Sequence, residues 1–370
     1  MCVGAHARIY IRIYNMKKKV VVGMSGGVDS SVAALLLKEQ GYDVLGLFMR
    51  NWHEEDDNGC CTAEEDYSDV RKVASLLEIP YYTIDLSKEY QDRVFKHFLD
   101  EYKAGRTPNP DVLCNVEIKF GPFREYARKI GADFVATGHY CGVERRDGKT
   151  YLTRALDENK DQTYFLNQVK QNQIDNVIFP LTDIDKPTVR KIAEEHGLAT
   201  AEKKDSTGIC FIGERDFRKF LKSYLPMQKG KICTLDGRVI GEHDGVFYYT
   251  IGQRKGFGLG GIKGEKNDAP YYIVKKDVYK NILYVNQGEC DELFTKELVA
   301  EDFNYICDPI ENVQRVLLRT RHREKLTPAT AYVEGKDVRV VADTPVRAVT
   351  SGQYAVLYSD RICLGGGKIK

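Results

Sequence analysis

The sequence predicts an α/β fold with a doubly wound parallel sheet, followed by a small central domain and a C-terminal β-barrel. Two observations predict the sheet. Strand-like runs alternate with helix-like segments through the first half of the chain, and the first run, 20–22, is the all-valine pattern of a strand buried on both faces. A third observation predicts the later domains, because short β-rich runs separated by glycine-rich stretches begin near residue 216.

The elements of the first domain, which we expect over residues 16–215, follow a regular rhythm. We expect helices near 28–40, 62–78, 88–104 and 117–130, a last helix at 188–196, and strands at 20–23, 44–48, 81–84 and 133–137. Ligands bind at the carboxyl ends of parallel strands. Met49 and Gly138, which follow two of these strands, should therefore flank a ligand together with the loop at 23–31.

The remaining chain divides into two further units. Residues 216–286 are expected to form the small central β-rich domain, and alternating runs such as "VQRVLLRTRH" and "QYAVLY" predict a β-barrel over 287–370. We interpret residues 1–15 as a disordered or misassigned extension before Met16, since basic residues interrupt its apolar ones and no cleavage site follows.

Composition excludes several classes of protein. The 55 basic and 54 acidic residues give a net charge of +1, so any nucleic-acid contact must come from local clusters of basic residues. The longest apolar runs are far shorter than a membrane span, so we expect a cytoplasmic protein without a membrane partner. Ten cysteines without a signal peptide favour free thiols, metal ligands or redox chemistry over a structural disulfide framework.

The stretch "GMSGGVDSS" lies in a strand-to-helix turn, where successive backbone N–H groups and the positive end of a helix suit a phosphate. It has neither the Gly-Lys-Ser/Thr of a Walker loop nor the spacing of a dinucleotide fingerprint. It matches the PP-loop of the ATP pyrophosphatases, whose fold is adenine nucleotide alpha hydrolase-like. This resemblance implies that the loop grips the β- and γ-phosphates of ATP while AMP is transferred to a carbonyl oxygen. Asp29 could hold Mg²⁺ on those phosphates. The expected nucleotide-binding residues are Gly23, Met24, Ser25, Gly26, Gly27, Val28, Asp29, Ser30, Met49 and Gly138.

A PP-loop does not identify the nucleophile of the second half-reaction, but two cysteines are candidates. Cys114 follows two prolines and precedes an expected helix, whose positive end would favour an exposed thiolate. Cys210 follows a glycine, with Lys203, Lys204 and Arg215 near it in sequence. We expect both cysteines to lie on loops rather than in the core.

The motifs "GMSGGVDSSV", "GRTPNPDVLCN", "ATGHY", "NKDQTYFL", "KKDSTGICFIGER", "TIGQRKGFGLGG" and "CLGGG" together resemble the tRNA-specific 2-thiouridylase family, the MnmA/TrmU group. The resemblance runs from about Met16 to the C-terminus. It implies an ATP-dependent tRNA-uridine 2-sulfurtransferase that adenylates O2 of the wobble uridine, U34, and replaces that oxygen with sulfur.

The same resemblance implies roles for three residues. Cys210 carries a persulfide that is loaded by a cysteine desulfurase or through a sulfur relay. Cys114 attacks that persulfide and either releases hydrosulfide or forms a disulfide with Cys210. Asp111, three residues before Cys114, is placed to act as a general base or to orient the base, although it could instead cap the turn after Pro110.

For tRNA, the densest basic cluster is 315–325, in which Arg319, Arg321 and Arg323 would share one face of a strand. Without the resemblance, the residues favour a solvated strand face over direct contact with RNA. With it, contacts to the anticodon stem-loop are expected at Asn109, Pro110, Asp111, His139, Lys160, Asp161, Gln162, Arg321, His322 and Gln353. His139 could stack on the flipped base.

Three other functions remain open from the residues. A PP-loop amide synthetase, or a tRNA-binding protein that holds ATP only as a structural ligand, would leave the two cysteine loops without a role. An iron–sulfur thiolase could use Asp111, Cys114 and Cys210 as ligands, but the sequence contains no C-x-x-C motif to support a cluster.

Overall fold

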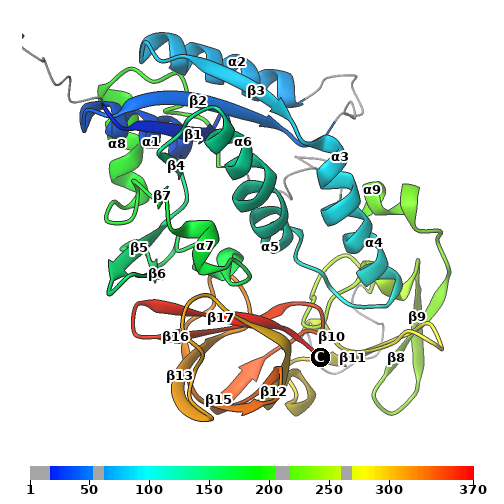
Figure 1. Cartoon of the computed structure of the whole chain (residues 1–370). Helices are drawn as coiled ribbons and strands as arrows, with labels where there is room; N and C mark the ends of the chain where they lie inside the picture. Colours follow the sequence, from blue (N-terminus) through cyan, green and yellow to red (C-terminus); the bar gives the residue numbers. More distant parts are fainter. Residues whose placement is uncertain (1–16, 53–61, 206–216, 260–268) are drawn as a thin grey trace, which may run out of the picture.

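The computed structural model describes residues 17–52, 62–205, 217–259 and 269–370. The prediction of a parallel sheet is confirmed: five strands lie in the order β3-β2-β1-β4-β7, and every neighbouring pair is parallel (Figure 1). These strands are β1 Lys19–Met24, β2 Asp43–Arg50, β3 Tyr81–Asp85, β4 Phe134–Thr137 and β7 Val177–Ile178.

Helices cover both faces of this sheet, so the fold is doubly wound as predicted. Val20 and Val22 belong to a core shared with α1, α2 and α8, whereas Val21 belongs to the core formed with α4, α5 and α6. All three valines are completely buried because the strand has a helical layer on each side. The helices are α1 Val28–Glu39, α2 Thr62–Leu76, α3 Ser87–Tyr90, α4 Lys96–Lys103, α5 Pro110–Cys114, α6 Arg124–Lys129, α7 Gln171–Ile174, α8 Lys186–Glu195 and α9 Phe217–Tyr224.

The segment around Cys114 is helical, which the sequence did not predict. α5, a π-helical stretch at Asn115–Phe123 and α6 form one continuous run with a kink at Gly121. Asn109 caps this run through its Oδ1, which accepts a hydrogen bond from the Val112 N–H at 3.4 Å, and Pro110 fits the first turn. The asparagine and prolines that suggested a loop are in fact the start signal of a helix.

The central domain is a four-stranded sheet in the order β10-β11-β8-β9, with β11 and β8 parallel. The C-terminal domain is a closed antiparallel barrel in the order β12-β15-β14-β13-β16-β17, because β12 also pairs with β17. The strands are β8 Gly230–Thr234, β9 Val239–His243, β10 Tyr271–Asp277, β11 Ile282–Gln287, β12 Phe294–Tyr305, β13 Val313–Arg319, β14 Thr327–Glu334, β15 Asp337–Arg347, β16 Tyr354–Ser359 and β17 Ile362–Ile369.

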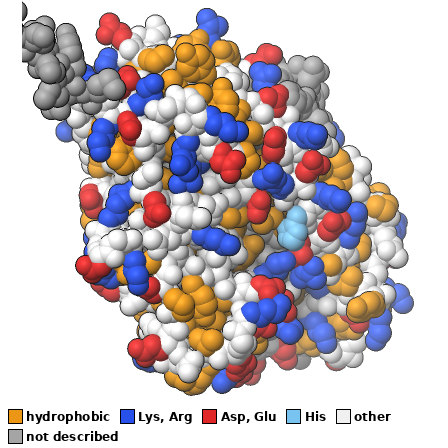
Figure 2. All heavy atoms as spheres, viewed as in Figure 1, with side chains coloured by type: hydrophobic (Ala, Val, Ile, Leu, Met, Phe, Trp, Pro, Cys, Tyr) orange, Lys and Arg blue, Asp and Glu red, His pale blue; other side chains and the backbone are white. Residues whose placement is uncertain are grey.

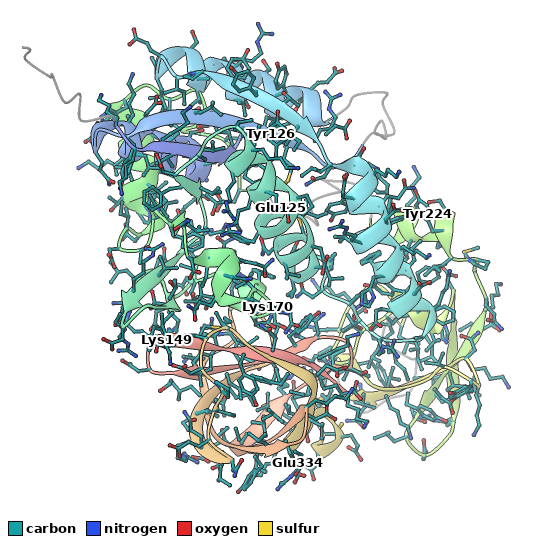
Figure 3. All side chains as sticks on the ribbon, in the orientation of Figure 1. Glu125, Tyr126, Lys149, Lys170, Tyr224 and Glu334 are labelled. Carbon is teal, nitrogen blue, oxygen red and sulfur yellow. The ribbon has the colours of Figure 1, made fainter. Side chains whose placement is uncertain are left out.

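A hairpin of the first domain extends the sheet of the barrel. β5 (Cys141–Arg146) and β6 (Lys149–Arg154) follow β4, and β6 pairs with β17 through Thr153 and Leu152. Lys149, at the turn of this hairpin, reaches the barrel side and forms an ion pair with Asp308 (Figure 3). The first and last domains are therefore joined by main-chain hydrogen bonds as well as by side chains.

The face of the protein shown in Figure 2 carries no large patch of charges of a single sign. Figure 2 shows basic and acidic side chains interspersed over this face, in agreement with the net charge of +1. An anionic partner would have to be recognised by a few positioned cations rather than by overall charge.

Candidate functional site

The turn between β1 and α1 is built to leave backbone donors open. Gly27 is the N-cap of α1 and has no side chain to cap it. The serine hydroxyls instead organise the turn from within: Ser31 Oγ donates to Gly27 O at 2.9 Å, and the Ser25 N–H donates to Ser30 Oγ at 3.1 Å. The first-turn N–H groups of α1 thus remain directed at the position where an anion would bind.

Two glycines allow the close packing around this turn. Gly26 has a φ of +77°, and a Cβ added there would lie 2.6 Å from the carbonyl oxygen of Asp66. A Cβ on Gly138, just after β4, would lie 2.7 Å from the Ser30 nitrogen. The end of β4 therefore packs directly on the start of α1. Met49, at the end of β2, is half-buried near the same sheet edge. The structure thus brings the expected nucleotide-binding residues together.

Asp29, in the first turn of α1, lies at the centre of a charged network that the sequence did not reveal. Its Oδ1 accepts hydrogen bonds from Tyr140 Oη at 2.8 Å and from Lys186 Nζ at 2.7 Å. Lys186 also contacts Asp205 at 2.8 Å. Lys186 is separated from Asp29 by 157 positions, and no local sequence signal connects them.

Asp205 is held by two further cations, Lys160 at 2.6 Å and Arg190 at 2.9 Å. Burial opposes ionisation of this carboxyl, but hydrogen bonds from Lys160 and Lys186 outweigh it and lower the pKa of Asp205 to about 2. Asp205 is therefore a fixed negative charge. It immediately precedes 206–216, so Cys210 lies outside the described residues.

Asp29 fits the way in which Mg²⁺ binds at phosphate sites. Among the described residues no group of three or more His, Cys, Asp or Glu side chains could hold a metal ion. A dedicated cage is not needed, because Mg²⁺ is commonly bound by one or two carboxylates together with the phosphates of the substrate. Asp29, which is 32% exposed beside the open N–H groups of α1, offers one such carboxylate.

The expectation that Cys114 lies on an exposed loop is wrong. Cys114 is the last residue of α5, is 1% exposed and belongs to the apolar core that includes Ile118 and Phe123. The proline-rich segment before it is short, and the helix begins at Pro110, four residues earlier than Cys114. The thiol therefore faces the protein interior rather than the solvent.

Asp111 lies in the first turn of α5 and is half-buried. Burial raises the pKa of its carboxyl above the usual 3.8, and the nearby Lys119 only partly opposes this. A carboxylate with a raised pKa beside a helix start can accept a proton from a substrate more readily than an ordinary surface aspartate.

Gln353 of the barrel holds the segment that precedes α5. Its Nε2 donates to the carbonyl of Thr107 at 2.8 Å and to that of Pro108 at 3.2 Å, while its Oε1 accepts from Asn109 Nδ2 at 3.3 Å. Three of the predicted tRNA-binding residues, Asn109, Pro110 and Gln353, thus come together at one contact between the first domain and the barrel.

Four other predicted tRNA-binding residues are engaged inside the protein. His139 is 8% exposed, packs against Phe179 and shares a hydrogen bond with Thr137 Oγ1 at 2.7 Å. Burial moves its pKa well below the usual 6.5, so the ring is neutral. Gln162 Oε1 accepts from the Tyr140 N–H at 2.9 Å, and Lys160 is bonded to Asp205. Asp161 is 1% exposed and offers no surface to RNA in this arrangement.

The expectation of one basic strand face is also wrong. β13 ends at Arg319, so Arg321 and Arg323 lie in the turn that follows it. Arg319 is 4% exposed and is paired with Asp161, because its side chain points between the domains rather than to solvent. Within the described chain, no hydrogen bond or ion pair engages the Arg321 guanidinium. His322 is neutral, since burial and the neighbouring Arg323 lower its pKa to about 4.

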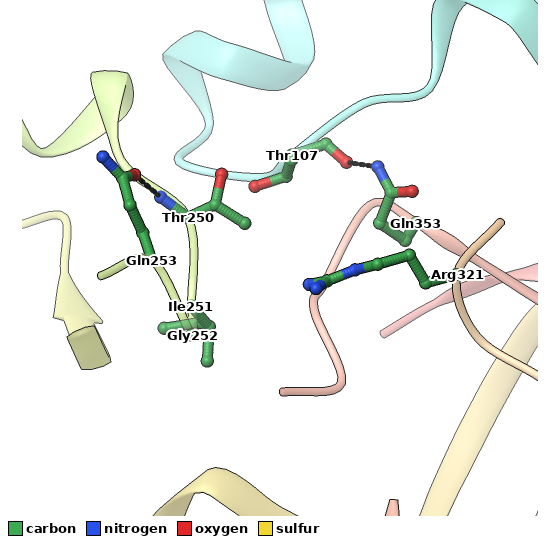
Figure 4. Close-up of a pocket in the computed structure, with 7 residues that line it drawn as sticks. All are labelled: Thr107, Thr250, Ile251, Gly252, Gln253, Arg321 and Gln353. Carbon is green, nitrogen blue, oxygen red and sulfur yellow. Dashed lines mark hydrogen bonds between the residues drawn. The ribbon is translucent and has the colours of Figure 1, made fainter. Parts of the chain in front are cut away.

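Arg321 lines a cavity of 310 Å³ at the junction of the three domains (Figure 4). Thr107 comes from the first domain, Arg321 and Gln353 come from the barrel, and the stretch Thr250–Gln253 comes from the central domain. This last stretch begins the motif "TIGQRKGFGLGG", but the sequence assigned it no role in the site, because only the structure brings it to Arg321. A guanidinium that is free to bind in this cavity is suited to a phosphate or a base edge.

In the described part of the chain, no helix combines the length and the apolar composition needed to cross a membrane.

Protein-family models match three consecutive parts of the chain. They are a tRNA methyl transferase HUP domain over residues 18–214, a tRNA methyl transferase PRC-barrel domain over 218–287 and an aminomethyltransferase beta-barrel domain over 295–369. Among solved structures, the U34-tRNA thiolase NcsA from Methanococcus maripaludis aligns over 56% of this chain and 66% of that chain, with 20% identity and a TM-score of 0.34. A similarity at that level supports no inference about this chain.

Full-length relatives are much more similar. The tRNA-specific 2-thiouridylase MnmA of Streptococcus thermophilus strain CNRZ 1066 is 56% identical over 358 residues, which are 96% of each chain. The protein of the same name from Streptococcus agalactiae serotype III strain NEM316 is also 56% identical, and that from Streptococcus mutans serotype c is 55% identical, each with 96% of both chains aligned. Because the identity is this high across almost the whole length, the chain belongs to the tRNA-specific 2-thiouridylase family.

Proposed function

We propose that this protein is an ATP-dependent tRNA-uridine 2-sulfurtransferase that converts the wobble uridine, U34, to 2-thiouridine. The observation that carries the proposal is the 56% identity over 96% of both chains to relatives named for that activity. The open start of α1 beside Asp29 supports the use of ATP. Arg321, which is unpaired among the described residues, supports an anionic polymer as substrate.

In the first half-reaction, O2 of the uridine attacks the α-phosphorus of ATP. The bond to the β-phosphate breaks, and pyrophosphate leaves with the bonding electrons while the N–H groups at 26–30 hold its charge. Asp29 would hold Mg²⁺, which would supply further positive charge to the phosphates. The reaction leaves AMP on O2, which makes C2 electrophilic. Met49 and Gly138, at the ends of β2 and β4 on either side of β1, would border the adenosine.

In the second half-reaction, a persulfide on Cys210 supplies sulfur to C2, and AMP departs with the former O2. Cys114 attacks the inner sulfur of the persulfide, so that a Cys114–Cys210 disulfide forms and the terminal sulfur leaves as hydrosulfide. This hydrosulfide attacks C2, forms the C–S bond and displaces AMP. A thiol reductant must then cleave that disulfide. Cys114 is buried among apolar side chains, so its thiol must become exposed before it can react with the persulfide. Asp111 acts as the general base or orients the uracil.

The tRNA would lie across the three-domain junction. Arg321 and the neighbouring His322 and Gln353 would contact the anticodon stem-loop, and the helix start at Asn109–Asp111 would border the extruded uridine. We propose that the three domains span residues 16–215, 216–286 and 287–370. A cysteine desulfurase or a relay protein would load Cys210, and the reaction would take place in the cytoplasm.

The decisive experiment combines the protein with ATP, Mg²⁺, a persulfide source and unmodified tRNA whose anticodon begins with U. We expect 2-thiouridine in the digested tRNA together with stoichiometric release of AMP and pyrophosphate. Absence of all three products would overturn the proposal. A visible charge-transfer band in anaerobically purified protein, lost together with activity on chelation, would instead favour an iron–sulfur route.

A further inference from the structure

The PP-loop lacks the positively charged side chain that a bound triphosphate needs, and another part of the fold supplies it. Between Gly23 and Ser31 the chain contains no lysine or arginine, and its one charged side chain, Asp29, is negative. A triphosphate brings several negative charges to this place. The N-terminal dipole of α1 offers only about half a positive charge. A bound triphosphate therefore needs a cation from another part of the chain.

Lys186 is the cation that the structure places there. It is the first residue of α8, and α8 packs beside α1 on one face of the sheet (Figure 1). Lys186 Nζ lies 2.7 Å from Asp29 Oδ1, so its positive charge reaches the start of α1, where the helix dipole also favours an anion. Lys186 is also fixed from behind, since its backbone N–H donates to Asp157 Oδ2 at 3.1 Å and its side chain is only 9% exposed.

The network is arranged so that Lys186 can turn from a carboxylate to a phosphate. Three cations, Lys160, Lys186 and Arg190, face two carboxylates, Asp29 and Asp205. Asp205 keeps Lys160 and Arg190 as partners if Lys186 moves, and Asp29 keeps the hydroxyl of Tyr140. Neither carboxylate would then be left buried without a partner, which is the usual cost of breaking such a pair.

We propose that Lys186 binds the β- and γ-phosphates of ATP and the pyrophosphate that leaves, as the lysine that the PP-loop itself lacks. This inference rests on the proposed use of ATP by this chain. It adds a residue from the far end of the domain to the nucleotide site, and it explains why a lysine is buried beside an otherwise complete helix start.

The test is binding rather than turnover. Lys186→Met should weaken the binding of ATP and of pyrophosphate by about tenfold to a hundredfold, the range for removing one charge-assisted hydrogen bond, and should leave the affinity for AMP unchanged. Lys186→Arg should restore most of the ATP affinity. Lys191→Met is the matched control, because Lys191 lies on the same helix with 73% of its side chain exposed and should not affect either ligand.

Equal loss of ATP and AMP affinity, or no change in either, would overturn the proposal and leave Lys186 with a structural role. If Lys186→Met does not fold, Lys186→Gln keeps hydrogen bonds to both carboxylates without the charge, and the same comparison of ATP with AMP applies. Failure of the proposed function would be distinguishable, since the wild-type protein would then bind ATP without forming 2-thiouridine on any tRNA.

Discussion

Arg319 of the barrel donates a hydrogen bond from Nη1 to Oδ2 of Asp161 in the first domain at 2.7 Å, and the two side chains are 4% and 0% exposed. Thr163 Oγ1 donates to the same carboxylate at 2.8 Å. Four positions earlier on the same strand, Arg315 pairs with Asp343 at the same distance of 2.7 Å, but there the side chains are 61% and 48% exposed. The two arginines therefore make the same bond in opposite environments.

This contrast predicts the stability of two variants. Arg319→Met removes the closer of the two arginines that face the buried charge of Asp161, leaving Arg154 Nε at 3.6 Å, and should cost up to about 3–5 kcal/mol. Arg315→Met removes only a solvated pair and should cost about 0–1 kcal/mol. Urea unfolding midpoints measure both. Asp161→Leu combined with Arg319→Met should recover part of the loss, and a double variant as unstable as the single one would argue against an isolated buried pair.

Arg321→Ala should weaken tRNA binding and reduce the slope of log affinity against log salt by about one ion, the effect of removing a single phosphate contact. The physical reason is that Arg321 has no partner in the described protein and is available to a phosphate, whereas Arg315 is neutralised by Asp343. Arg315→Ala is therefore the control and should keep the wild-type slope. Titrations of labelled tRNA at several salt concentrations measure this, and an unchanged slope for Arg321→Ala would remove it from the interface.

The raised pKa of Asp111 predicts that the rate of thiolation falls on the acid side of its pH profile. Burial raises its pKa above 3.8, and only the ionised form is a base, so the rate should fall as pH drops toward that raised pKa. Asp111→Asn should remove this fall in rate and slow thiolation by about 10²–10⁴-fold. Single-turnover rates across pH measure the effect.

The raised pKa of Asp111 also makes the stability of the folded protein depend on pH. Between 3.8 and the raised pKa the folded protein binds more protons at Asp111 than the unfolded chain does, so its stability falls as pH rises through that window. Asp111→Asn should therefore melt at or above the wild-type temperature at neutral pH. A lower melting temperature there would contradict burial as the cause of the shift.

Gly138→Ala should disrupt the nucleotide site through α1. The new methyl group would lie 2.7 Å from the Asp29 carbonyl carbon and the Ser30 nitrogen, so the first turn of α1 must move. We expect ATP affinity to fall at least about tenfold, together with about 1–3 kcal/mol of stability for the overpacking. Gly148→Ala separates the two effects. Gly148 has a φ of +71°, and no described atom lies within 4 Å of the added Cβ, so stability should fall while ATP affinity stays unchanged.

Variants of the two cysteines should separate the adenylation of the uridine from the transfer of sulfur. Activation of the uridine requires no thiol, so Cys210→Ser should keep tRNA-dependent pyrophosphate release and lose thiolation, whereas Asp29→Ala should lose both. Cys114→Ser should still accept a persulfide at Cys210 and fail to complete transfer. Cys233→Ser, a buried thiol of the central domain, should behave as wild type. Mass spectrometry of the persulfide and pyrophosphate assays measure these outcomes; a stable persulfide on Cys114 instead would reverse the roles.

Patterns that are local in sequence predicted most of the fold. The valine strand, the glycine turn and the helix after it are specified by neighbouring residues, and they were found where expected. Two predictions were wrong. Alternation predicted that Arg319, Arg321 and Arg323 share one strand face, but β13 ends at Arg319, and the first domain buries that residue through Asp161. For Cys114, the cap at Asn109 and the proline after it suggest a loop, although they also begin helices.

The contacts of the site that the sequence did not predict join segments that lie far apart in the chain. Lys186 reaches Asp29 only because α8 packs on α1, and the stretch Thr250–Gln253 faces Arg321 only because three domains meet. Such contacts between distant segments are created by packing, so a single sequence without aligned relatives does not contain them.

The pairing of β6 with β17 has a consequence for how the chain folds during synthesis. Residues 152–153 of β6 pair with residues 362–363 of β17, and the Thr107 N–H donates a hydrogen bond to Ser351 O at 2.9 Å. These segments of the first domain therefore lack their partners until β17 and the segment before it have been synthesised. Such long-range closures slow folding and leave a strand edge exposed while translation continues. On the ribosome, the β5–β6 hairpin should stay accessible to proteases until β17 has emerged and paired with β6. Completion of the barrel is therefore a late step in the folding of the nascent protein.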